Sequence, residues 1–197
     1  GIHAESDPDK PALIMAGKGC TLTFGDFEAL SRRCAQLFRS RGLHPGDAIA
    51  MCLENQPWFL PLCWGAHRAG LTYTCLATHL GSDEAAYIVS DCGASLYVGS
   101  AAKADVAKAL HAASPGPRHW LMLDGASDGF ESFEAAVEAQ SAEPLADESE
   151  GADMLYSSGT TGRPKGVEVA LSGDPLGTVD PRWEALGALY GMAPESV

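Results

Sequence analysis

Apolar residues recur with strand or helix spacing along most of the chain. Residues 11–16 and 21–24, separated by Gly17-Lys18-Gly19, predict a β-hairpin with a glycine-containing turn. Thr23 is a candidate N-cap, because the apolar residues after it repeat at helical spacing while arginines take the other side. Those apolar residues are Phe27, Leu30, Cys34, Leu37 and Phe38. The pattern predicts an amphipathic helix that ends at Gly42.

Further along, short apolar runs alternate with amphipathic helical patterns. The runs predict strands at residues 48–53, 71–76, 94–98 and 119–123. The helical patterns predict helices at residues 57–68, 83–91, 101–111 and 130–140. Asn55 and Ser82 are candidate N-caps of the first two helices. Strands that alternate with helices in this way predict an α/β fold, a mostly parallel sheet flanked by helices on both faces.

An acidic segment divides the chain. Residues 141–153 carry Glu143, Asp147, Glu148, Glu150 and Asp153 but no basic residue. We expect a solvated linker here, and an acidic interaction site is the less favoured alternative. The predicted organisation is an α/β subdomain at 1–140, the linker at 141–153, and a segment at 154–197 that starts with a strand and begins a further subdomain.

Composition restricts the classes of function. Of 197 residues, 46% are hydrophobic and 20% charged, which is typical of a globular protein and excludes wholesale disorder. The formal net charge of -13 disfavours a nucleic-acid-binding surface. No basic-then-apolar leader and no run of about eighteen apolar residues is visible, so we expect a cytoplasmic protein without a signal peptide or membrane span.

Cysteine and histidine spacing does not indicate a metal site. The six cysteines form no C-x-x-C pair and lie mostly in apolar runs, which predicts buried free thiols rather than disulfides or zinc ligands. His67, His79, His111 and His119 show no ligand spacing with one another or with the cysteines. We therefore predict no metal bound by the protein's own side chains in this chain.

The candidate chemistry lies in the stretch from Met154 to Val167. A short apolar run is followed by a loop rich in hydroxyls and glycines that also carries Lys165. Glycines let backbone N–H groups approach a ligand, and hydroxyls and lysine donate to anionic oxygens, so the loop suits polyphosphate. A flexible surface turn without a ligand is the alternative. Arg163 and Lys165 favour the ligand, since they place positive charge in an acidic chain, and Pro164 stiffens the arm between them.

The loop is not a Walker A motif, Gly-x-x-x-x-Gly-Lys-[Ser/Thr]. The glycine before Lys165 is Gly162, three residues back, and Gly166 stands where the magnesium-binding hydroxyl belongs. The string YSSGTTGRPKGV instead closely resembles the phosphate-binding signature of the adenylate-forming superfamily. This superfamily includes acyl-CoA synthetases, luciferases and nonribosomal-peptide adenylation domains.

The resemblance to acyl-CoA synthetases extends upstream of the loop and covers about residues 11–167. The similar stretches are Leu22-Thr23-Phe24, the run from Arg41 to Asp47, Glu54-Asn55 with the helix ending Arg68-Ala69-Gly70, and the run from Asp83 to Val89. It implies a two-step reaction. A carboxylic acid attacks the α-phosphate of Mg-ATP to give an acyl-adenylate and pyrophosphate, and the thiol of coenzyme A then accepts the acyl group.

By the same resemblance, the loop residues hold the β- and γ-phosphates of ATP. They are Ser157, Ser158, Gly159, Thr160, Thr161 and Gly162, together with Lys165. Lys165 is the catalytic candidate, because its charge offsets the charge on the departing pyrophosphate.

The family's later motifs are not found in residues 166–197, where there is no Thr-Glu pair of the magnesium and nucleotide motif. The resemblance therefore implies the N-terminal part of an acid:CoA ligase, inactive alone and prone to self-association through uncovered apolar surface. A medium or long fatty acid is the preferred substrate. Two alternatives stay open: a non-catalytic nucleotide-binding or scaffolding module that retains the loop, and a simple NTPase or phosphotransferase.

Overall fold

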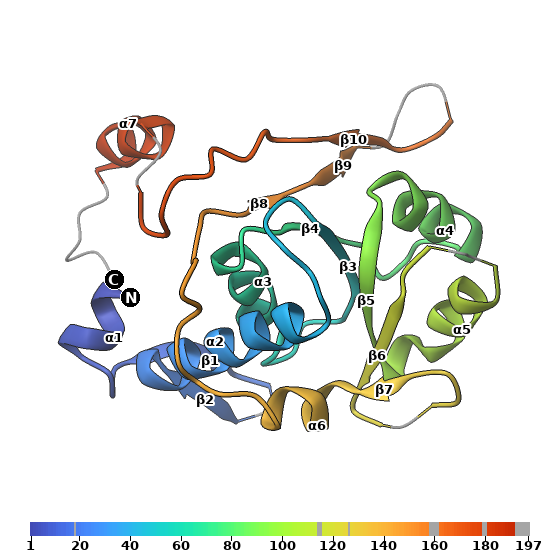
Figure 1. Ribbon diagram of the computed structural model, residues 1–197, viewed down its shortest axis with the longest axis horizontal. Coiled ribbons are helices and arrows are strands. Elements are labelled where there is room, and N and C mark those ends of the chain that lie inside the picture. The colour runs from blue at the N-terminus through green and yellow to red at the C-terminus, as the bar shows by residue number, and fades with distance from the viewer. Residues whose placement is uncertain (18, 114–115, 126, 158–161, 179–180, 192–197) are drawn as a thin grey trace.

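A six-stranded sheet lies at the centre of the molecule, with helices on both faces (Figure 1). The computed structural model describes residues 1–17, 19–113, 116–125, 127–157, 162–178 and 181–191. The strand order is β7-β6-β5-β3-β4-β8, and every neighbouring pair is parallel. The strands are β3 (Ala48–Cys52), β4 (Thr72–Cys75), β5 (Ala94–Ser100), β6 (His119–Leu123), β7 (Glu131–Ser132) and β8 (Ala152–Asp153). The predicted α/β fold is confirmed.

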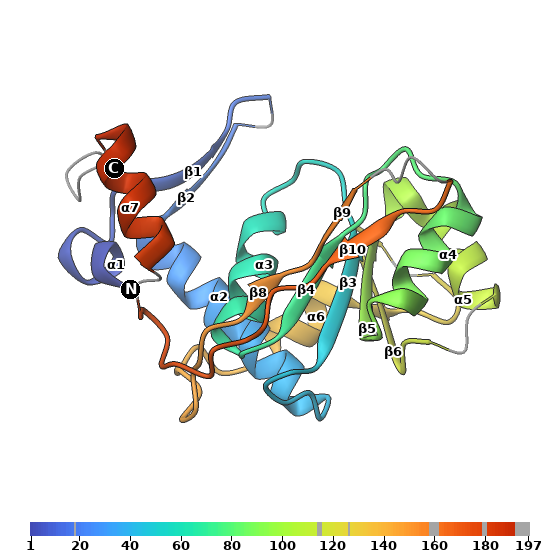
Figure 2. The same ribbon diagram turned by 90° about the horizontal axis from the view of Figure 1, so that it is seen from above.

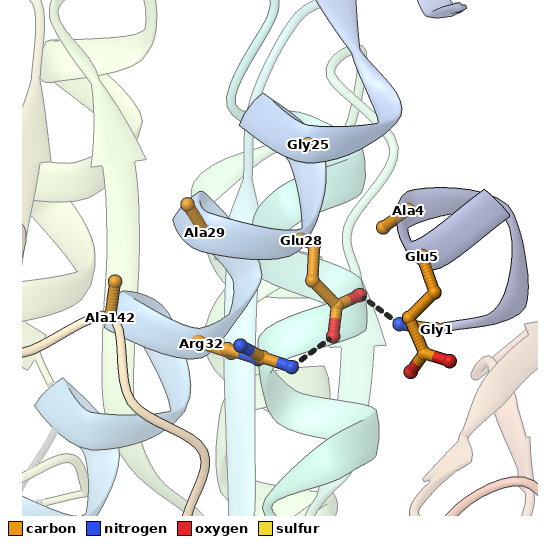
Figure 3. A pocket seen from close by; sticks show the side chains of 8 residues that line it. All are labelled: Gly1, Ala4, Glu5, Gly25, Glu28, Ala29, Arg32 and Ala142. Carbon is orange, nitrogen blue, oxygen red and sulfur yellow. Dashed lines mark ion pairs between the residues drawn. The ribbon is translucent and has the colours of Figure 1, made fainter. Parts of the chain in front are cut away.

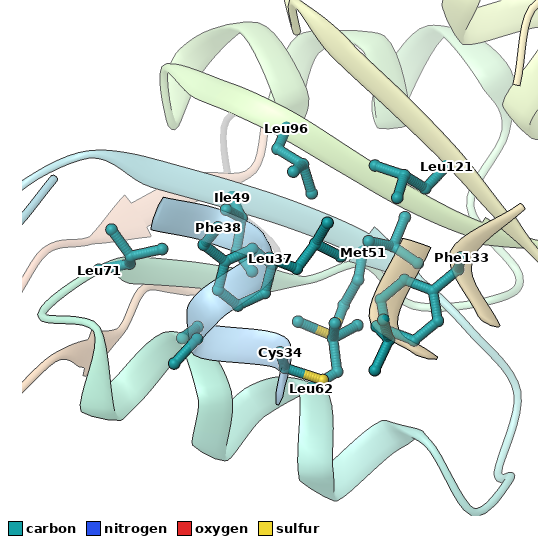
Figure 4. Packing of buried hydrophobic residues seen from close by; sticks show 14 of the residues in the cluster. Cys34, Leu37, Phe38, Ile49, Met51, Leu62, Leu71, Leu96, Leu121 and Phe133 are labelled. Atoms are coloured by element: carbon teal, nitrogen blue, oxygen red, sulfur yellow. The ribbon is translucent and has the colours of Figure 1, made fainter. Parts of the chain in front are cut away.

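Five helices pack on the sheet in two layers. They are α2 (Phe24–Ser40), α3 (Phe59–Arg68), α4 (Ser82–Asp91), α5 (Ala104–Ala113) and α6 (Phe133–Glu138). All residues of β3 are buried, and successive side chains of a strand point to opposite faces. Ile49 and Met51 therefore join the core under α2, α3 and α6 (Figure 4), while Ala50 and Cys52 join the core under α4 and α5. This double burial explains the continuous apolar runs in the sequence.

The start of α2 agrees with the prediction. The Thr23 hydroxyl accepts a hydrogen bond from the backbone N–H of Asp26 at 3.1 Å, and the Asp26 carboxylate accepts one from the Thr23 N–H at 3.1 Å. This reciprocal arrangement is a capping box, which satisfies N–H groups that have no partner inside the helix. The helix is followed by Arg41 and Gly42, as predicted.

Two other predicted caps are wrong. Helix α3 begins after Trp58, and its N-cap residue makes no side-chain hydrogen bond, so Asn55 does not cap it. Instead, the Gln56 side chain accepts a hydrogen bond from the Trp58 N–H at 3.1 Å. Helix α4 begins at Ser82 itself, with Gly81 at the N-cap and no side-chain hydrogen bond there. Both predictions failed because a polar residue near a helix start is only a candidate N-cap. The backbone conformation decides which residue begins the helix.

The helix expected over 130–140 is shorter than predicted. Residues 131–132 form the edge strand β7, and α6 covers only Phe133–Glu138. The Ser132 hydroxyl accepts a hydrogen bond from the Ala135 N–H at 3.3 Å and so caps α6. Helix α5 is likewise preceded by a single tight turn at Ala101–Lys103. Strands of two residues leave no periodic signal, which is why β7 was not predicted.

The N-terminal hairpin forms as predicted, from β1 (Pro11–Met15) and β2 (Cys20–Thr23). It is a separate two-stranded sheet that projects away from the central one (Figure 2). A short helix α1 (Ile2–Ser6), not predicted, precedes it, and a further helix, α7 (Pro181–Tyr190), lies near the other end of the chain.

The acidic segment lies against the first helical layer. Asp147 pairs with Arg39 at 3.1 Å, and Glu148 pairs at 3.1 Å with Arg68, whose side chain is 2% exposed. Arg68 also holds Glu28 of α2 at 2.8 Å. The segment then enters the sheet as β8, beside β4. Charge thus positions this stretch by pairing its carboxylates with helix cations. The division into units at 1–140, 141–153 and 154–197 stays a prediction.

The cysteines agree with the prediction in part. All six are free, and Cys34, Cys52, Cys63 and Cys92 are buried. Cys20 is half-buried and Cys75 is exposed, so the expectation of general burial is wrong for these two. Cys75 is the last residue of β4. Within the described ranges, no helix is both long and apolar enough to cross a lipid bilayer.

Candidate functional site

A second hairpin carries the candidate loop. Strand β9 (Leu155–Ser157) pairs antiparallel with β10 (Lys165–Val167), and the loop connects them. In this register Ser157 lies opposite Lys165, and Tyr156 lies opposite Gly166. Directly opposed residues on an antiparallel pair have Cβ atoms about 5 Å apart. The hairpin therefore brings a hydroxyl and a lysine together at the base of the loop.

The structure places three of the predicted site residues. Ser157 and Lys165 are exposed, so both side chains are available to a ligand, and Gly162 is exposed within the loop. Ser158, Gly159, Thr160 and Thr161, which were also predicted, lie outside the described residues. For the described part, the sequence motif and the hairpin geometry agree in bringing hydroxyl, glycine and lysine to one end of the hairpin.

Two positions of the motif require glycine, each for a different physical reason. Gly162 has φ +102°, a backbone conformation that residues with a side chain rarely adopt. Gly166 is required by space: a Cβ there would lie 2.4 Å from Cε of Met154 and 3.1 Å from the Tyr156 ring. The Tyr156 side chain thus lies against the opposite strand, and the motif's last glycine makes room for it.

Helix α4 anchors the hairpin. The Tyr156 hydroxyl donates a hydrogen bond to the Asp91 carboxylate at 2.7 Å, and burial together with this bond raises the pKa of Tyr156. The Tyr87 hydroxyl also donates to Asp91, at 3.4 Å. On the loop, the Arg163 guanidinium lies 5.3 Å from the centroid of the Tyr87 ring, a cation–π distance. Arg163 therefore contacts α4 rather than only water.

Sequence analysis missed Tyr87 and Asp91 as supporting residues. They lie four residues apart on α4, where i and i+4 side chains share a helix face. That spacing was visible in the sequence, but nothing in it showed that the β9–β10 hairpin would lie against this face. The contact is long-range, joining residues 65 positions apart.

A pocket of about 210 Å³ lies between the start of α4 and the loop. It is lined by Asp83, Glu84, Tyr87, Gly162, Arg163 and Pro164. Asp83 and Glu84 are in the first turn of α4, where carboxylates complement the helix dipole. They also give the pocket a negative wall that repels phosphate. We therefore expect an anionic ligand to lie at the Ser157–Lys165 end of the hairpin rather than in this pocket.

A second pocket, of about 300 Å³, lies far along the chain from the loop, between α1 and α2 (Figure 3). Its central group is Glu28, which pairs with the Gly1 amine at 2.8 Å and with Arg32 at 3.0 Å. Burial opposes ionisation, but hydrogen bonds from the Gly1 amine and Arg68 lower the pKa of Glu28 to about 2. None of its lining residues belongs to the predicted site, so we assign this pocket a structural role.

The donors around the loop suit phosphate better than a protein-bound metal. Ser157, Lys165 and the loop backbone offer hydroxyl, ammonium and N–H donors to anionic oxygens. In the part of the chain that the structure describes, no three His, Cys, Asp or Glu side chains gather as metal ligands.

Comparison with known proteins agrees with this chemistry. The chain belongs to the AMP-binding enzyme family, whose sequence pattern it matches over residues 2–172. This confirms the resemblance to adenylate-forming enzymes that the loop motif indicated.

The related proteins include acid–CoA ligases from several bacteria. The chain is 29% identical over 168 residues to the long-chain-fatty-acid–CoA ligase FadD13 of Mycobacterium tuberculosis (strain CDC 1551 / Oshkosh), covering 84% of the chain and 33% of that protein. It is 32% identical over 180 residues to the crotonobetaine/carnitine–CoA ligase of Salmonella paratyphi A, covering 84% and 34%. The chain spans about a third of the length of these curated relatives.

A solved structure supports the same fold. ATP-bound MatB from Rhodopseudomonas palustris superposes with a TM-score of 0.66 at 29% identity, covering 84% of the chain and 32% of MatB. The chain therefore shares its fold with a protein crystallised with ATP.

Proposed function

We propose that this chain is part of an ATP-dependent acid:CoA ligase and forms the site for the β- and γ-phosphates of ATP. The phosphates would be held by the hydroxyls of Ser157, Ser158, Thr160 and Thr161, by the backbone of Gly159 and Gly162, and by Lys165. Membership of the AMP-binding enzyme family supports the use of ATP. We also propose that the protein is located in the cytoplasm.

The observation that carries the proposal is the register of the β9–β10 hairpin. It sets Ser157 opposite Lys165, both exposed, at the base of a loop with Gly162 at positive φ. A cation and a hydroxyl on two paired strands form a fixed donor pair. Such donors stabilise negative charge most when they are held in place before the ligand arrives.

In the proposed reaction, a carboxylate oxygen attacks the α-phosphorus of ATP, the bond to the bridging oxygen breaks, and pyrophosphate leaves. Lys165 stabilises the charge that develops on the pyrophosphate, and Ser157 orients it. Mg²⁺ supplies further charge neutralisation when bound to the nucleotide, and the thiol of coenzyme A then accepts the acyl group. The chain alone is proposed to be inactive, because it covers only a third of its relatives' length.

We propose a medium or long fatty acid as the substrate. FadD13, named a long-chain-fatty-acid–CoA ligase, supports this choice. The crotonobetaine/carnitine–CoA ligase shows that relatives of similar identity differ in their acids. The substrate test therefore needs a panel of carboxylic acids that includes both kinds.

The decisive experiment is acid-dependent ATP–pyrophosphate exchange by the whole protein that contains this chain. We expect exchange with a fatty acid, and a loss of at least about tenfold in Lys165→Ala, since charge stabilisation of this kind is worth several kcal/mol. Lys108→Ala, which removes an exposed lysine on α5, is the matched control and should leave exchange unchanged.

Three outcomes would contradict the proposal. ATP binding without exchange for any acid would favour the nucleotide-binding or scaffolding module. Acid-independent hydrolysis of ATP would favour a simple NTPase. Equal exchange in Lys165→Ala and Lys108→Ala would remove Lys165 from the catalytic role.

A further inference from the structure

Two cysteines from different elements lie in contact on the α3 face of the sheet. Sγ of Cys63, in α3, is 3.8 Å from Sγ of Cys75, the last residue of β4. Among the residues that the structure describes, this is the one pair of thiols within hydrogen-bonding distance of each other. Cys34 is buried elsewhere in the same core, and Cys52 and Cys92 lie in the core under α4 and α5.

The two thiols differ in access and in acidity. Cys63 is 8% exposed and also contacts the Met51 sulfur at 3.8 Å, whereas Cys75 is exposed at the end of its strand. The hydrogen bond between the two thiols lowers the pKa of Cys75, although burial and the Asp153 carboxylate oppose that change. The same hydrogen bond, and then burial, raise the pKa of Cys63. Cys75 is therefore the thiol that ionises and meets a solute first.

We propose that Cys63 and Cys75 form a reversible oxidation site, in which Cys75 reacts with a hydroperoxide and Cys63 resolves the product to an intramolecular disulfide. The contact supplies the partner, since a disulfide forms most easily between thiols that are already close and need no backbone movement to meet. The difference in exposure assigns the roles. This site is inferred independently of the proposed function.

The chemistry balances with one equivalent of hydroperoxide. The Cys75 thiolate attacks the peroxide, an S–O bond forms, the O–O bond breaks, and an alcohol or water leaves with a proton. The Cys63 sulfur then attacks the sulfenic sulfur, the S–S bond forms, the S–O bond breaks, and water leaves. Each sulfur loses one electron and the peroxide gains two. A disulfide bond length of about 2.05 Å requires the sulfurs to approach further, and Cys75, exposed at the end of β4, is the side chain proposed to rotate.

The bond would act next to the candidate site. It would tether α3 to the carboxyl end of β4, and β4 pairs directly with β8, the strand that leads into the β9–β10 hairpin. Oxidation would thus restrain β4, the strand that pairs with β8 just before the β9–β10 hairpin.

Peptide mapping of the 197-residue chain tests the proposal. The reduced chain is treated with one equivalent of hydrogen peroxide, remaining thiols are blocked, and the products are digested and analysed by mass spectrometry. We expect a cross-linked peptide pair that joins Cys63 to Cys75, a fall from six free thiols to four, and full recovery of the six with a reducing agent. Cys20→Ser, which removes a half-buried thiol on the N-terminal hairpin, should give the same cross-linked pair, with its five free thiols falling to three.

Single variants separate the two roles. In Cys63→Ser, Cys75 should stop at a sulfenic acid that a dimedone probe traps, with no disulfide. In Cys75→Ser, Cys63 should react no faster than buried Cys34. A wild-type chain in which Cys75 is oxidised to sulfinic acid while Cys63 stays reduced would overturn the proposal, as would a disulfide that joins any other pair. The wild-type map decides this even if a variant fails to fold.

Discussion

The side chains that hold the β9–β10 hairpin in place belong to the loop motif but are not among its proposed phosphate-binding residues. Tyr156 donates to Asp91 at 2.7 Å, and Arg163 lies over the ring of Tyr87. Motif residues such as Ser157 and Lys165 face outward, where a ligand can reach them. Along β9, the anchoring Tyr156 and the outward-facing Ser157 therefore alternate, as expected for a strand whose successive side chains point to opposite faces.

The anchoring bond can be tested with Tyr156→Phe. Loss of the hydroxyl should lower the free energy of unfolding by about 1 kcal/mol, the usual contribution of a hydrogen bond. Urea denaturation followed by circular dichroism measures this. Tyr87→Phe is the matched control, because its hydroxyl lies 3.4 Å from the same carboxylate and its ring, which Arg163 contacts, is kept. An equal loss in both variants would contradict a specific role for Tyr156.

Glu28 should make stability depend on acid pH. Its pKa is lowered from 4.5 to about 2 in the folded chain, so its ionised form favours folding. That contribution is fully present above pH 4.5 and is lost as pH falls toward about 2. The difference in unfolding free energy between the wild type and Glu28→Gln should therefore shrink across this range, as measured by urea denaturation at several pH values. A difference independent of pH would show that Glu28 acts through packing.

At the scale of elements, the periodic parts of the chain were predictable and the contact-dependent parts were not. Strands β3 to β6 were predicted because burial on both faces leaves long apolar runs. Strands β7 and β8 were missed because each has two residues and is defined by its neighbour rather than by its own pattern. The loop motif could likewise be recognised from the sequence. Its attachment to α4 could not, because it depends on a contact between residues far apart in the chain.

Helix caps show the same limit. The prediction of Thr23 is confirmed, and the structure shows that Asp26, three residues later, completes a capping box with it. Ser82 was predicted wrongly because an isolated serine does not fix where the first helical residue lies.

Replacement of Thr23 and of Ser82 should therefore change the free energy of unfolding by different amounts. Thr23→Ala removes a hydrogen bond at the start of α2 and should lower the free energy of unfolding by about 1 kcal/mol. Ser82→Ala removes no cap and should change it by less than about 0.5 kcal/mol. Thermal or urea unfolding of both variants measures the contrast. A destabilisation by Ser82→Ala as large as that by Thr23→Ala would contradict the assigned caps.

At the scale of the whole molecule, part of the exposed apolar surface lies on the same hairpin that carries the candidate site. Leu155 is 61% exposed and Val167 is 58% exposed, and the two are direct cross-strand partners. Paired apolar side chains on an exposed hairpin favour association, because burying them removes apolar area from water. The net charge of -13 opposes association through repulsion at low salt.

We therefore expect the isolated chain to self-associate, more strongly as salt screens the repulsion. Light scattering over a wide range of protein and salt concentrations should show a rising average mass, and the double variant Leu155→Thr, Val167→Thr should lower it. Ile14→Thr is the matched control, since Ile14 is 66% exposed on the other hairpin without belonging to this pair. A monomer at all concentrations would contradict the prediction. Equal effects of the double variant and Ile14→Thr would show that general exposure of apolar side chains, rather than the β9–β10 hairpin, drives association.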